Sequence, residues 1–356
     1  MHPYNLADGN LLGDDSGPSK YAVMLREMLW AMHYQHANPD AKIPRDAFVT
    51  DWSPETLAWT LFTESPTDIA VNHCLRIDKV FADGLCSHRK NAELASRWPN
   101  RIIPYAGINP VNGLRVSMDD LRRQVDEIPG IVGLKVYPNA GTPDHSWRMD
   151  DPEWTPLFEL ALELGLKVIA VHKVVPNGLV PLAPFAIDDL EMRAIAHPEL
   201  TFEIVHAGLP PFVEEVALAI MRLPNVYANL EITSAILERG MGYIVDSLAQ
   251  MIAMGSAYKI IYSSGAMHFH PRPIVEAIAN LHFSDQLLER YNMPQITKTD
   301  KAQILGANYA RIIGLDIERA KREIADDEFS VSVRENGLQP AWSYWSKNDP
   351  RWDAAS

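Results

Sequence analysis

The chain alternates between short apolar runs and longer amphipathic segments. The segments between the runs predict helices, such as 118–128 and 151–165, which begin near Asp and end near Pro or Gly. Successive runs begin roughly 30 residues apart, which is the length of one βα unit. The runs are rich in aliphatic and β-branched residues and predict seven strands, at 68–73, 102–109, 131–137, 166–172, 200–206, 225–231 and 259–264.

Continuously apolar strands that alternate with amphipathic helices indicate a parallel sheet covered by helices. Seven βα units, with room for one more strand near the N-terminus, predict an α/β fold of the (β/α)8 TIM-barrel type over residues 65–315. An open doubly wound sheet is the alternative, but no G-x-G-x-x-G follows any strand. Residues 1–64 are expected to form an irregular N-terminal segment with the first βα unit, in which no clean first strand can be recognised.

Residues 316–356 are expected to form a C-terminal helix followed by an extended tail. The tail carries Trp342, Tyr344, Trp345 and Trp352, and is too apolar for a free, solvated chain end. We therefore expect it to pack against the barrel or against a neighbouring subunit.

Composition narrows the class of protein. A content of 47% hydrophobic and 22% charged residues is typical of a globular protein with an ample core. The net charge of −14 and the absence of a Lys/Arg-rich run make nucleic acid and anionic membranes unexpected partners. Without a signal-peptide pattern or a long apolar stretch, the chain is expected to be cytoplasmic. Its two cysteines, Cys74 and Cys86, are too few for a disulfide framework and are expected to be thiols.

Histidines stand at the carboxyl ends of three predicted strands, where TIM barrels carry their chemistry. These residues are His73, His172 and His206. A neutral imidazole ligates Zn, Mn or Fe, and the ends of neighbouring strands converge at the barrel mouth. His172 and His206 therefore predict a divalent metal site, and the competing interpretation is that each is a hydrogen-bonded structural histidine.

Three further residues complete the candidate site. Lys135 follows an apolar run, and we assign it a catalytic role as a carboxylate-binding cation or a base of lowered pKa; a surface lysine is the alternative. Glu231 can act as acid, base or ligand, or can bond neighbouring amides. His268 belongs to the sequence HFHP and is a third candidate metal ligand, although it falls beyond the strand, in the loop before the next helix.

Six motifs occur in order along the chain, and they are GLKVYPNAG, VIAVHK, HPELTFEIVHAGLPPFVEE, PNVYANLE, KIIYSSGAMHFHPRP and ILGANYARIIGL. Together they resemble the amidohydrolase superfamily, in its branch of aminocarboxymuconate-semialdehyde decarboxylase-like proteins, over roughly residues 65–315. This resemblance implies a TIM barrel with a divalent metal held by a His-x-His on the first strand, histidines ending the fifth and often the sixth, and an aspartate after the eighth. It places His172 and His206 at the fifth- and sixth-strand positions.

The chain departs from the family pattern at two places. Gly265 occupies the slot of the aspartate, and the histidines of residues 1–60, which are His2, His33 and His36, do not form a His-x-His. These losses favour a subunit with a degenerate metal site that supports a related amidohydrolase-like chain in a hetero-oligomer. The resemblance implies oxidative chemistry on a small amino acid, as in enzymes of the 2-aminoisobutyrate hydroxylase type.

Two alternatives remain. The first is a stand-alone metal-dependent decarboxylase or hydrolase that acts on a small carboxylate, with Lys135 binding the carboxylate and Glu231 or His206 moving a proton. The second is a metal-free binding or scaffold barrel. Turnover by the purified chain alone distinguishes the first from a subunit, and stoichiometric metal excludes the second.

Overall fold

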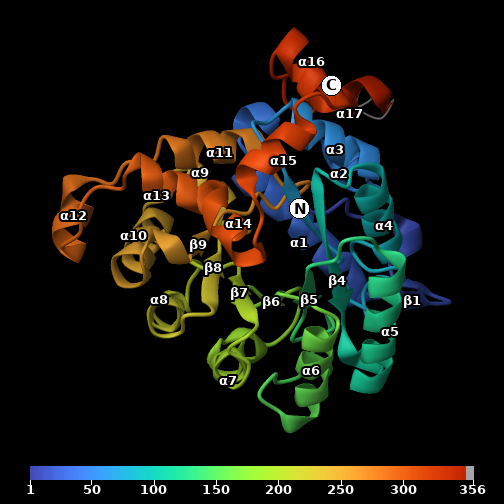
Figure 1. The fold of residues 1–356 in the computed structure, drawn as a ribbon. Helices are drawn as coiled ribbons and strands as arrows, with labels where there is room; N and C mark the ends of the chain where they lie inside the picture. The colour runs from blue at the N-terminus through green and yellow to red at the C-terminus, as the bar shows by residue number, and fades with distance from the viewer. Residues whose placement is uncertain (350–356) are drawn as a thin grey trace.

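Parallel strands form a curled sheet in which each strand pairs with the next along the chain (Figure 1). The computed structural model describes residues 1–349, and within them the sheet has seven strands. All seven predicted strands are confirmed, most of them shorter than predicted. Their bounds are β3 Ala70–His73, β4 Ile102–Ile108, β5 Gly133–Val136, β6 Val168–His172, β7 Thr201–Val205, β8 Val226–Asn229 and β9 Ile260–Ile261. A small hairpin, β1 Gly13–Asp14 with β2 Gly17–Pro18, lies apart from the sheet.

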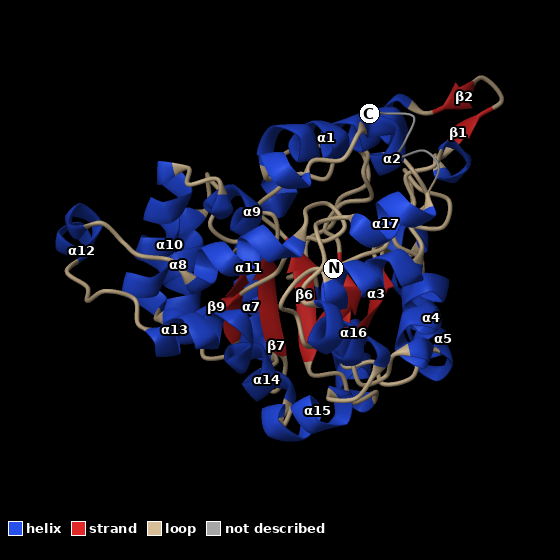
Figure 2. Ribbon diagram, turned by 90° about the horizontal axis from the view of Figure 1, so that it is seen from above, coloured by secondary structure: helices blue, strands red, loops and turns tan. Residues whose placement is uncertain are grey.

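Helices surround the curled sheet, which lies at the centre of the view from above (Figure 2). Those that follow the strands along the chain are α4 His88–Arg97, α5 Leu114–Glu127, α6 Thr155–Glu163, α7 Asp188–Ala196, α8 Val213–Arg222, α9 Thr233–Glu238, α10 Gly242–Gly255 and α11 Pro271–Ala279. The N-terminal segment contributes α1 Lys20–His36, α2 Arg45–Phe48 and α3 Pro54–Thr63. The C-terminal part contributes α12 Asp285–Tyr291, α13 Lys298–Ala302, α14 Asn308–Ile313, α15 Ile317–Ile324, α16 Glu328–Asn336 and α17 Ser343–Asn348.

The alternation of side chains along a strand explains why the strands read as continuously apolar. On β6, Ile169 and Val171 pack into the layer between sheet and helices, whereas Val168 and Ala170 pack with Tyr105 inside the barrel. Both faces of the strand are therefore buried, as a sheet covered by helices requires. The same alternation turns the last residue of β6, His172, toward the interior at the mouth of the barrel.

Residues 1–6 occupy the gap between β3 and the segment after β9, where the first strand was expected. The Met1 nitrogen donates to the Val71 carbonyl oxygen over 3.1 Å, and the Met267 N–H donates to the His2 carbonyl oxygen over 3.3 Å. The Leu6 N–H donates to the Thr50 carbonyl oxygen. These bonds place His2 at the mouth of the barrel, which the sequence pattern did not predict.

Helix α1 and the residues that follow it cross the loops at the carboxyl ends of the strands. The His268 ring bonds to the Leu29 carbonyl oxygen of α1 over 2.8 Å, and His33 Nδ1 lies 2.6 Å from the His268 carbonyl oxygen. Asn38 donates to Glu238, which ends α9. Helix α1 therefore covers the mouth of the barrel.

The C-terminal segment packs against the N-terminal segment, as expected from its aromatic residues. The ring of Trp345 lies 3.9 Å from that of Trp52, centroid to centroid, and Trp342 lies 5.8 Å from Trp52. Both C-terminal tryptophans are buried. The tail, residues 337–356, was predicted to be extended, and this is wrong for Ser343–Asn348, which form α17. The prediction for Trp352 lies outside the described residues.

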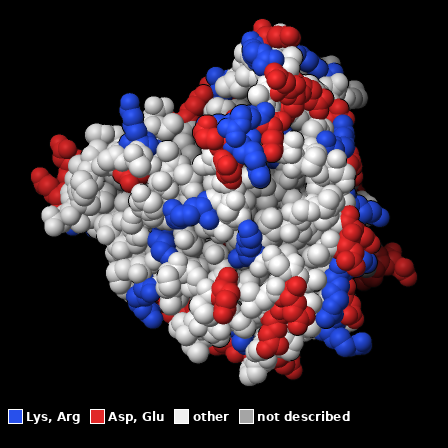
Figure 3. All heavy atoms as spheres, viewed as in Figure 1, with Lys and Arg blue, Asp and Glu red and all other residues white. Residues whose placement is uncertain are grey.

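The prediction that both cysteines are thiols is confirmed. Cys74 and Cys86 are both free and buried thiols. On the face shown in Figure 3, acidic and basic side chains are interspersed, and no broad field of one sign lies on it. No helix within residues 1–349 combines the length and the apolar character needed to cross a bilayer.

The contacts of His33 predict that the protein loses stability in weak acid. Burial lowers the pKa of His33 to about 4. Its Nε2 accepts a hydrogen bond from the Ile43 N–H, so this nitrogen cannot take up a second ring proton without losing that bond. The unfolded chain, with a histidine pKa near 6.5, binds that proton first. The free energy of unfolding should therefore fall between pH 6.5 and 4, by up to about 1.4 kcal/mol per pH unit for this one residue.

Urea unfolding between pH 7 and 4 measures this effect. A His33→Gln variant keeps an acceptor and a donor but cannot titrate, so its free energy of unfolding should depend less steeply on pH than that of the wild type. The exposed His282→Gln serves as the control and should leave the slope unchanged. Equal slopes for wild type and His33→Gln would show that His33 does not carry the acid sensitivity.

Candidate metal centre at the barrel mouth

Polar side chains from five strands converge at the covered mouth of the barrel. His73 ends β3 and His172 ends β6, while His206 and Glu231 follow the ends of β7 and β8. Lys135 lies one residue before the end of β5. All five are buried. The structure thus brings together four of the five residues predicted for the site, which are Lys135, His172, His206 and Glu231.

One group of residues centres on the Glu231 carboxylate. His2 Nε2 lies 2.7 Å from Glu231 Oε1, and Lys135 Nζ lies 3.9 Å from Glu231 Oε2. One ligand atom from each of His2, His73 and Glu231 can be chosen so that all three lie within 4.8 Å of one another. Two imidazoles and a carboxylate are a common donor set for Zn, Mn or Fe.

Several polar atoms of this group have no partner. Within residues 1–349, His2 Nδ1, His73 Nδ1 and Lys135 Nζ are buried and make no hydrogen bond. Buried polar atoms are nearly always satisfied in folded proteins, so three unsatisfied atoms in one place indicate a site that binds something. Their arrangement fits a cation or a polar substrate group at this position.

A second group consists of His172 and His206, whose rings face each other. His172 Nε2 lies 2.8 Å from the Val175 carbonyl oxygen, and His206 Nδ1 lies 3.1 Å from the Glu231 carbonyl oxygen. Carbonyl oxygens accept only, so each of these nitrogens carries the proton of its neutral ring. The other two nitrogens, His172 Nδ1 and His206 Nε2, are 3.1 Å apart and both bear lone pairs.

With these protons on the outer nitrogens, His172 and His206 are arranged as two histidines that bind one metal ion together. Metal-bound histidines commonly donate their other N–H to a backbone carbonyl, which fixes the tautomer and turns the free lone pair toward the metal. Both rings satisfy that condition. Two lone pairs that face each other repel, and a cation bound by both nitrogens would remove this repulsion.

Electrostatics keep the histidines neutral and the carboxylate charged. Burial lowers the pKa of His2 to about 4 and that of His206 to about 4. Burial alone would raise the pKa of Glu231, but His2, Lys135 and His206 hold it well below its usual value. Burial also lowers the pKa of Lys135 to about 8, against the opposing effect of Glu231. The metal-binding forms of the imidazoles and of the carboxylate are thus present at neutral pH.

The structure does not bring His268 into either group. Its Nε2 bonds to Leu29 of α1, and its ring stacks on Phe269 at 4.5 Å. The HFHP sequence lies in the loop before α11, as expected, so its two histidines do not share one face of a strand. His268 ties the covering helix to the loop after β9.

Sequence reasoning missed His2 and gave His73 no role. His2 lies in no recognisable strand, because residues 1–6 are too short and too irregular to show a period of two. His73 did show a signal, since it ends a predicted strand in the same way as His172. The short sequence His2-Pro3-Tyr4 carries one histidine where the family pattern has two.

The carboxylate of Glu231 lies close to position 265. A Cβ atom built on Gly265 would lie 3.8 Å from Glu231 Cγ. A side chain at position 265 would therefore begin in van der Waals contact with the Glu231 side chain. A carboxylate from the end of β8 lies beside the position where the family pattern has an aspartate after the last strand.

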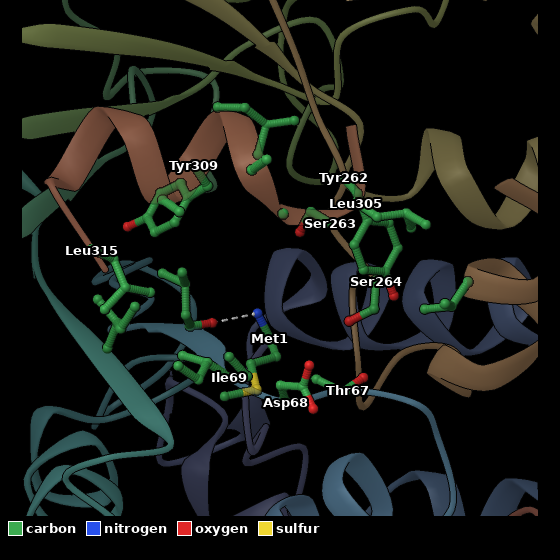
Figure 4. Close-up of a pocket in the computed structure, with 18 of the residues that line it drawn as sticks. Met1, Thr67, Asp68, Ile69, Tyr262, Ser263, Ser264, Leu305, Tyr309 and Leu315 are labelled. Atoms are coloured by element: carbon green, nitrogen blue, oxygen red, sulfur yellow. Dashed lines mark hydrogen bonds between the residues drawn. The ribbon is translucent and has the colours of Figure 1, made fainter. Parts of the chain in front are cut away.

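A cavity of about 450 Å³ opens between β3 and β9, beneath α14 and α15 (Figure 4). Apolar side chains make up most of its lining, together with Tyr262, Ser264 and Tyr309, which are labelled in the figure. Its lining also includes His73 and Glu203. The cavity thus reaches one of the candidate ligands from the side away from α1.

Comparison with known proteins places the chain. Two solved structures share its fold. An uncharacterised TIM-barrel protein from Bordetella bronchiseptica has 16% sequence identity and a TM-score of 0.57, over 82% of this chain and 92% of that chain. A manganese-bound 5-carboxyvanillate decarboxylase from Novosphingobium aromaticivorans has 15% identity and a TM-score of 0.51, over 83% of this chain and 92% of that chain. No curated protein sequence matches the chain. The sequence profile of the amidohydrolase family matches residues 48–315. With most of its length matched and the barrel in place, the chain belongs to the amidohydrolase family, as its motifs predicted.

Proposed function

We propose that the protein is a metal-dependent decarboxylase or hydrolase that acts on a small carboxylate without a catalytic partner chain. The observation that carries this proposal is the His172–His206 pair, in which two buried lone pairs face each other 3.1 Å apart. The carbonyl groups of Val175 and Glu231 orient both rings for a metal. A subunit that had lost its chemistry would have no need to keep this arrangement.

Each neighbouring residue has a definite task. When bound, a divalent cation supplies Lewis acidity and lowers the pKa of a coordinated water. Lys135 binds the substrate carboxylate, because its buried Nζ makes no hydrogen bond to a described residue and lies 3.9 Å from Glu231 Oε2, beyond hydrogen-bond reach. Glu231 accepts or returns a proton at the oxygen that faces Lys135, while His2 holds its other oxygen. Helix α1 excludes bulk water, which strengthens every one of these charge interactions.

The comparison structures support the class of reaction. One relative of the same fold is a decarboxylase with bound manganese. A carboxylate substrate also matches the buried ammonium of Lys135, which lies 3.9 Å from Glu231 Oε2. The substrate class is therefore inferred from the positive charge of Lys135.

Metal analysis with a turnover assay tests the proposal. Purified alone, the wild-type chain should hold stoichiometric Zn, Mn or Fe and should turn over at least one member of a panel of small aliphatic and aromatic carboxylates. The His172→Ala/His206→Ala double variant should lose the metal of this pair and its turnover should fall to background. His197→Ala, which removes a histidine from the outer layer near Phe158, is the control and should retain both.

The contrary outcomes are equally specific. A metal-bearing chain that is inactive alone, but gains activity with a co-purifying related chain, would replace this proposal by the hetero-oligomeric hydroxylase subunit. If the wild-type chain binds no metal after reconstitution, the stand-alone enzyme and the metal-dependent subunit are both excluded. The remaining interpretation is then a metal-free binding or scaffold barrel.

A further inference from the structure

We propose that His2, His73 and Glu231 form a second divalent-cation site, separate from the His172–His206 pair. This inference rests on the proposed function and adds to it a centre whose ligands come from the N-terminal segment, the end of β3 and the residue after the end of β8. The cation is a transition metal such as Mn, Fe or Zn, because two imidazoles and one carboxylate suit these ions better than Mg or Ca.

The geometry of the three residues supports a cation. Their ligand atoms lie within 4.8 Å of one another although they come from positions 2, 73 and 231 of the chain. All three side chains are buried, so the cluster is not an incidental gathering of surface groups. Bond lengths of about 2.0–2.2 Å to nitrogen and oxygen place such ligands roughly 3 to 4 Å apart, which small side-chain rotations achieve here.

Unsatisfied atoms give the second, independent observation. His73 is buried with no hydrogen bond from Nδ1 to any described residue, and the same is true of Nδ1 of His2. The ring of His73 lies 5.3 Å from that of His2 and 4.7 Å from that of Tyr105. A ring nitrogen buried in a core is normally hydrogen-bonded, and Nδ1 of His73 is not.

The charges around the cluster are consistent with an ion. Glu231 supplies one negative charge, and His2 and His73 are neutral because burial lowers the pKa of both rings. Lys135 is the one basic side chain that faces the carboxylate, at 3.9 Å. It makes no hydrogen bond to the described residues, so it is free to turn toward a substrate carboxylate when a cation binds Glu231.

Glu231 takes the place of a carboxylate from the loop after β9. Because a Cβ at position 265 would lie 3.8 Å from Glu231 Cγ, a side chain at 265 and the side chain of Glu231 would reach the same region. A cation can reach this region through the cavity between β3 and β9, whose lining includes His73. The site thus has three ligands, one of them a charged carboxylate, and a route of entry.

Metal stoichiometry is the decisive measurement. The purified chain, stripped with chelator and reloaded with Mn²⁺ or Zn²⁺, should bind two ions by mass spectrometry, and titration calorimetry should show two events. His73→Ala and Glu231→Gln should each bind one ion, with at least a tenfold loss of affinity for the other. The His172→Ala/His206→Ala variant should also bind one ion and should lose it when His73 or Glu231 is replaced as well.

A compensating exchange tests the geometry directly. Glu231→Ala should lose the second ion, and the double variant Glu231→Ala/Gly265→Asp should regain it, because the introduced carboxylate approaches from the neighbouring loop. Aspartate tolerates the positive φ of 61° at this position better than most residues. Glu203→Gln is the matched control: it alters another buried carboxylate, one bonded to Asn229 and Tyr105, and should keep both ions. Circular dichroism and urea unfolding confirm that each variant is folded.

The outcomes separate this proposal from the proposed function. One ion in the wild type that survives His73→Ala and disappears in the His172→Ala/His206→Ala variant would overturn the second site and leave the proposed function standing. One ion that survives the double histidine variant and disappears in His73→Ala would support the second site and remove the His172–His206 pair from the metal centre. A chain that binds no ion would overturn both.

Discussion

Replacing Lys135 by Met should abolish turnover and at the same time stabilise the fold. Lys135 Nζ is buried, has no hydrogen-bond partner among the described residues and lies 3.9 Å from the nearest carboxylate oxygen. Burying such a group costs free energy, and burial accordingly lowers its pKa to about 8. Methionine has a similar length without the polar atom. Lys135 makes no hydrogen bond and its 3.9 Å approach to Glu231 is long, so relief of its burial should outweigh the lost attraction, and the free energy of unfolding should rise by about 1–3 kcal/mol. At the same time kcat/KM for a carboxylate substrate should fall roughly 100-fold or more, because the cation that binds the substrate is gone.

Lys173 provides a matched control, for which the same substitution should change the free energy of unfolding in the opposite direction. It is as deeply buried as Lys135, but its Nζ is bonded to Asp189 at 2.6 Å and to the Pro184 carbonyl oxygen at 2.9 Å. Lys173→Met leaves the buried Asp189 without its cation and should destabilise the fold by roughly 3–5 kcal/mol. Urea unfolding of the two variants beside the wild type gives both numbers. If Lys135→Met is destabilised as strongly as Lys173→Met, Lys135 is a structural cation and not a substrate-binding one.

Glu64 anchors the C-terminal segment, and its loss should be among the most damaging single changes. The buried carboxylate accepts hydrogen bonds from the backbone N–H groups of Trp342 and Tyr344 and contacts His270 Nε2 at 3.0 Å. Glu64→Gln places an amide NH₂ against one of these donors. Leaving buried donors unpaired should lower the free energy of unfolding by about 3 kcal/mol.

A half-exposed glutamate on the same helical segment is the control for this change. Glu55 accepts a hydrogen bond from the Tyr344 hydroxyl, but its side chain is 44% exposed. Glu55→Gln should therefore cost no more than about 0.5–1 kcal/mol. Chemical denaturation monitored by tryptophan fluorescence suits the comparison, because Trp52, Trp342 and Trp345 pack together at this place. Equal losses for the two variants would show that the carboxylate of Glu64 is not a specific anchor.

The barrel could be predicted from the sequence because its signals are local. Each strand from β3 to β9 is a short apolar run, and the helices between them carry their own start and stop residues, such as Ser87, whose side chain caps α4. The convergence of His172, His206, Lys135 and Glu231 followed from one rule, that the carboxyl ends of parallel strands meet at one edge. Neither the barrel nor the convergence of these four residues required knowledge of contacts between distant segments of the chain.

The rest of the site depends on contacts that leave no local pattern. His2 reaches the mouth through single hydrogen bonds to β3 and to the segment after β9, and no period marks these residues as a strand. The HFHP motif predicted His268 as a ligand, yet its ring bonds to Leu29 of α1, which is 239 residues away in the chain. The proximity of Glu231 to position 265 is likewise visible only in three dimensions. Under the proposed function, motif loss alone overstates how degenerate the site is.

A substrate that enters from the side of α1, and not through the cavity between β3 and β9, should reach the mouth only when α1 moves. His33 and Leu29 hold this helix to the loop after β9, and Asn38 holds the following turn to α9. With every mouth residue buried beneath it, a substrate collides with a closed protein far more often than with an open one. The observed association rate should therefore level off at high ligand concentration, at the rate of helix displacement, instead of rising in proportion to concentration as it does for an open cleft.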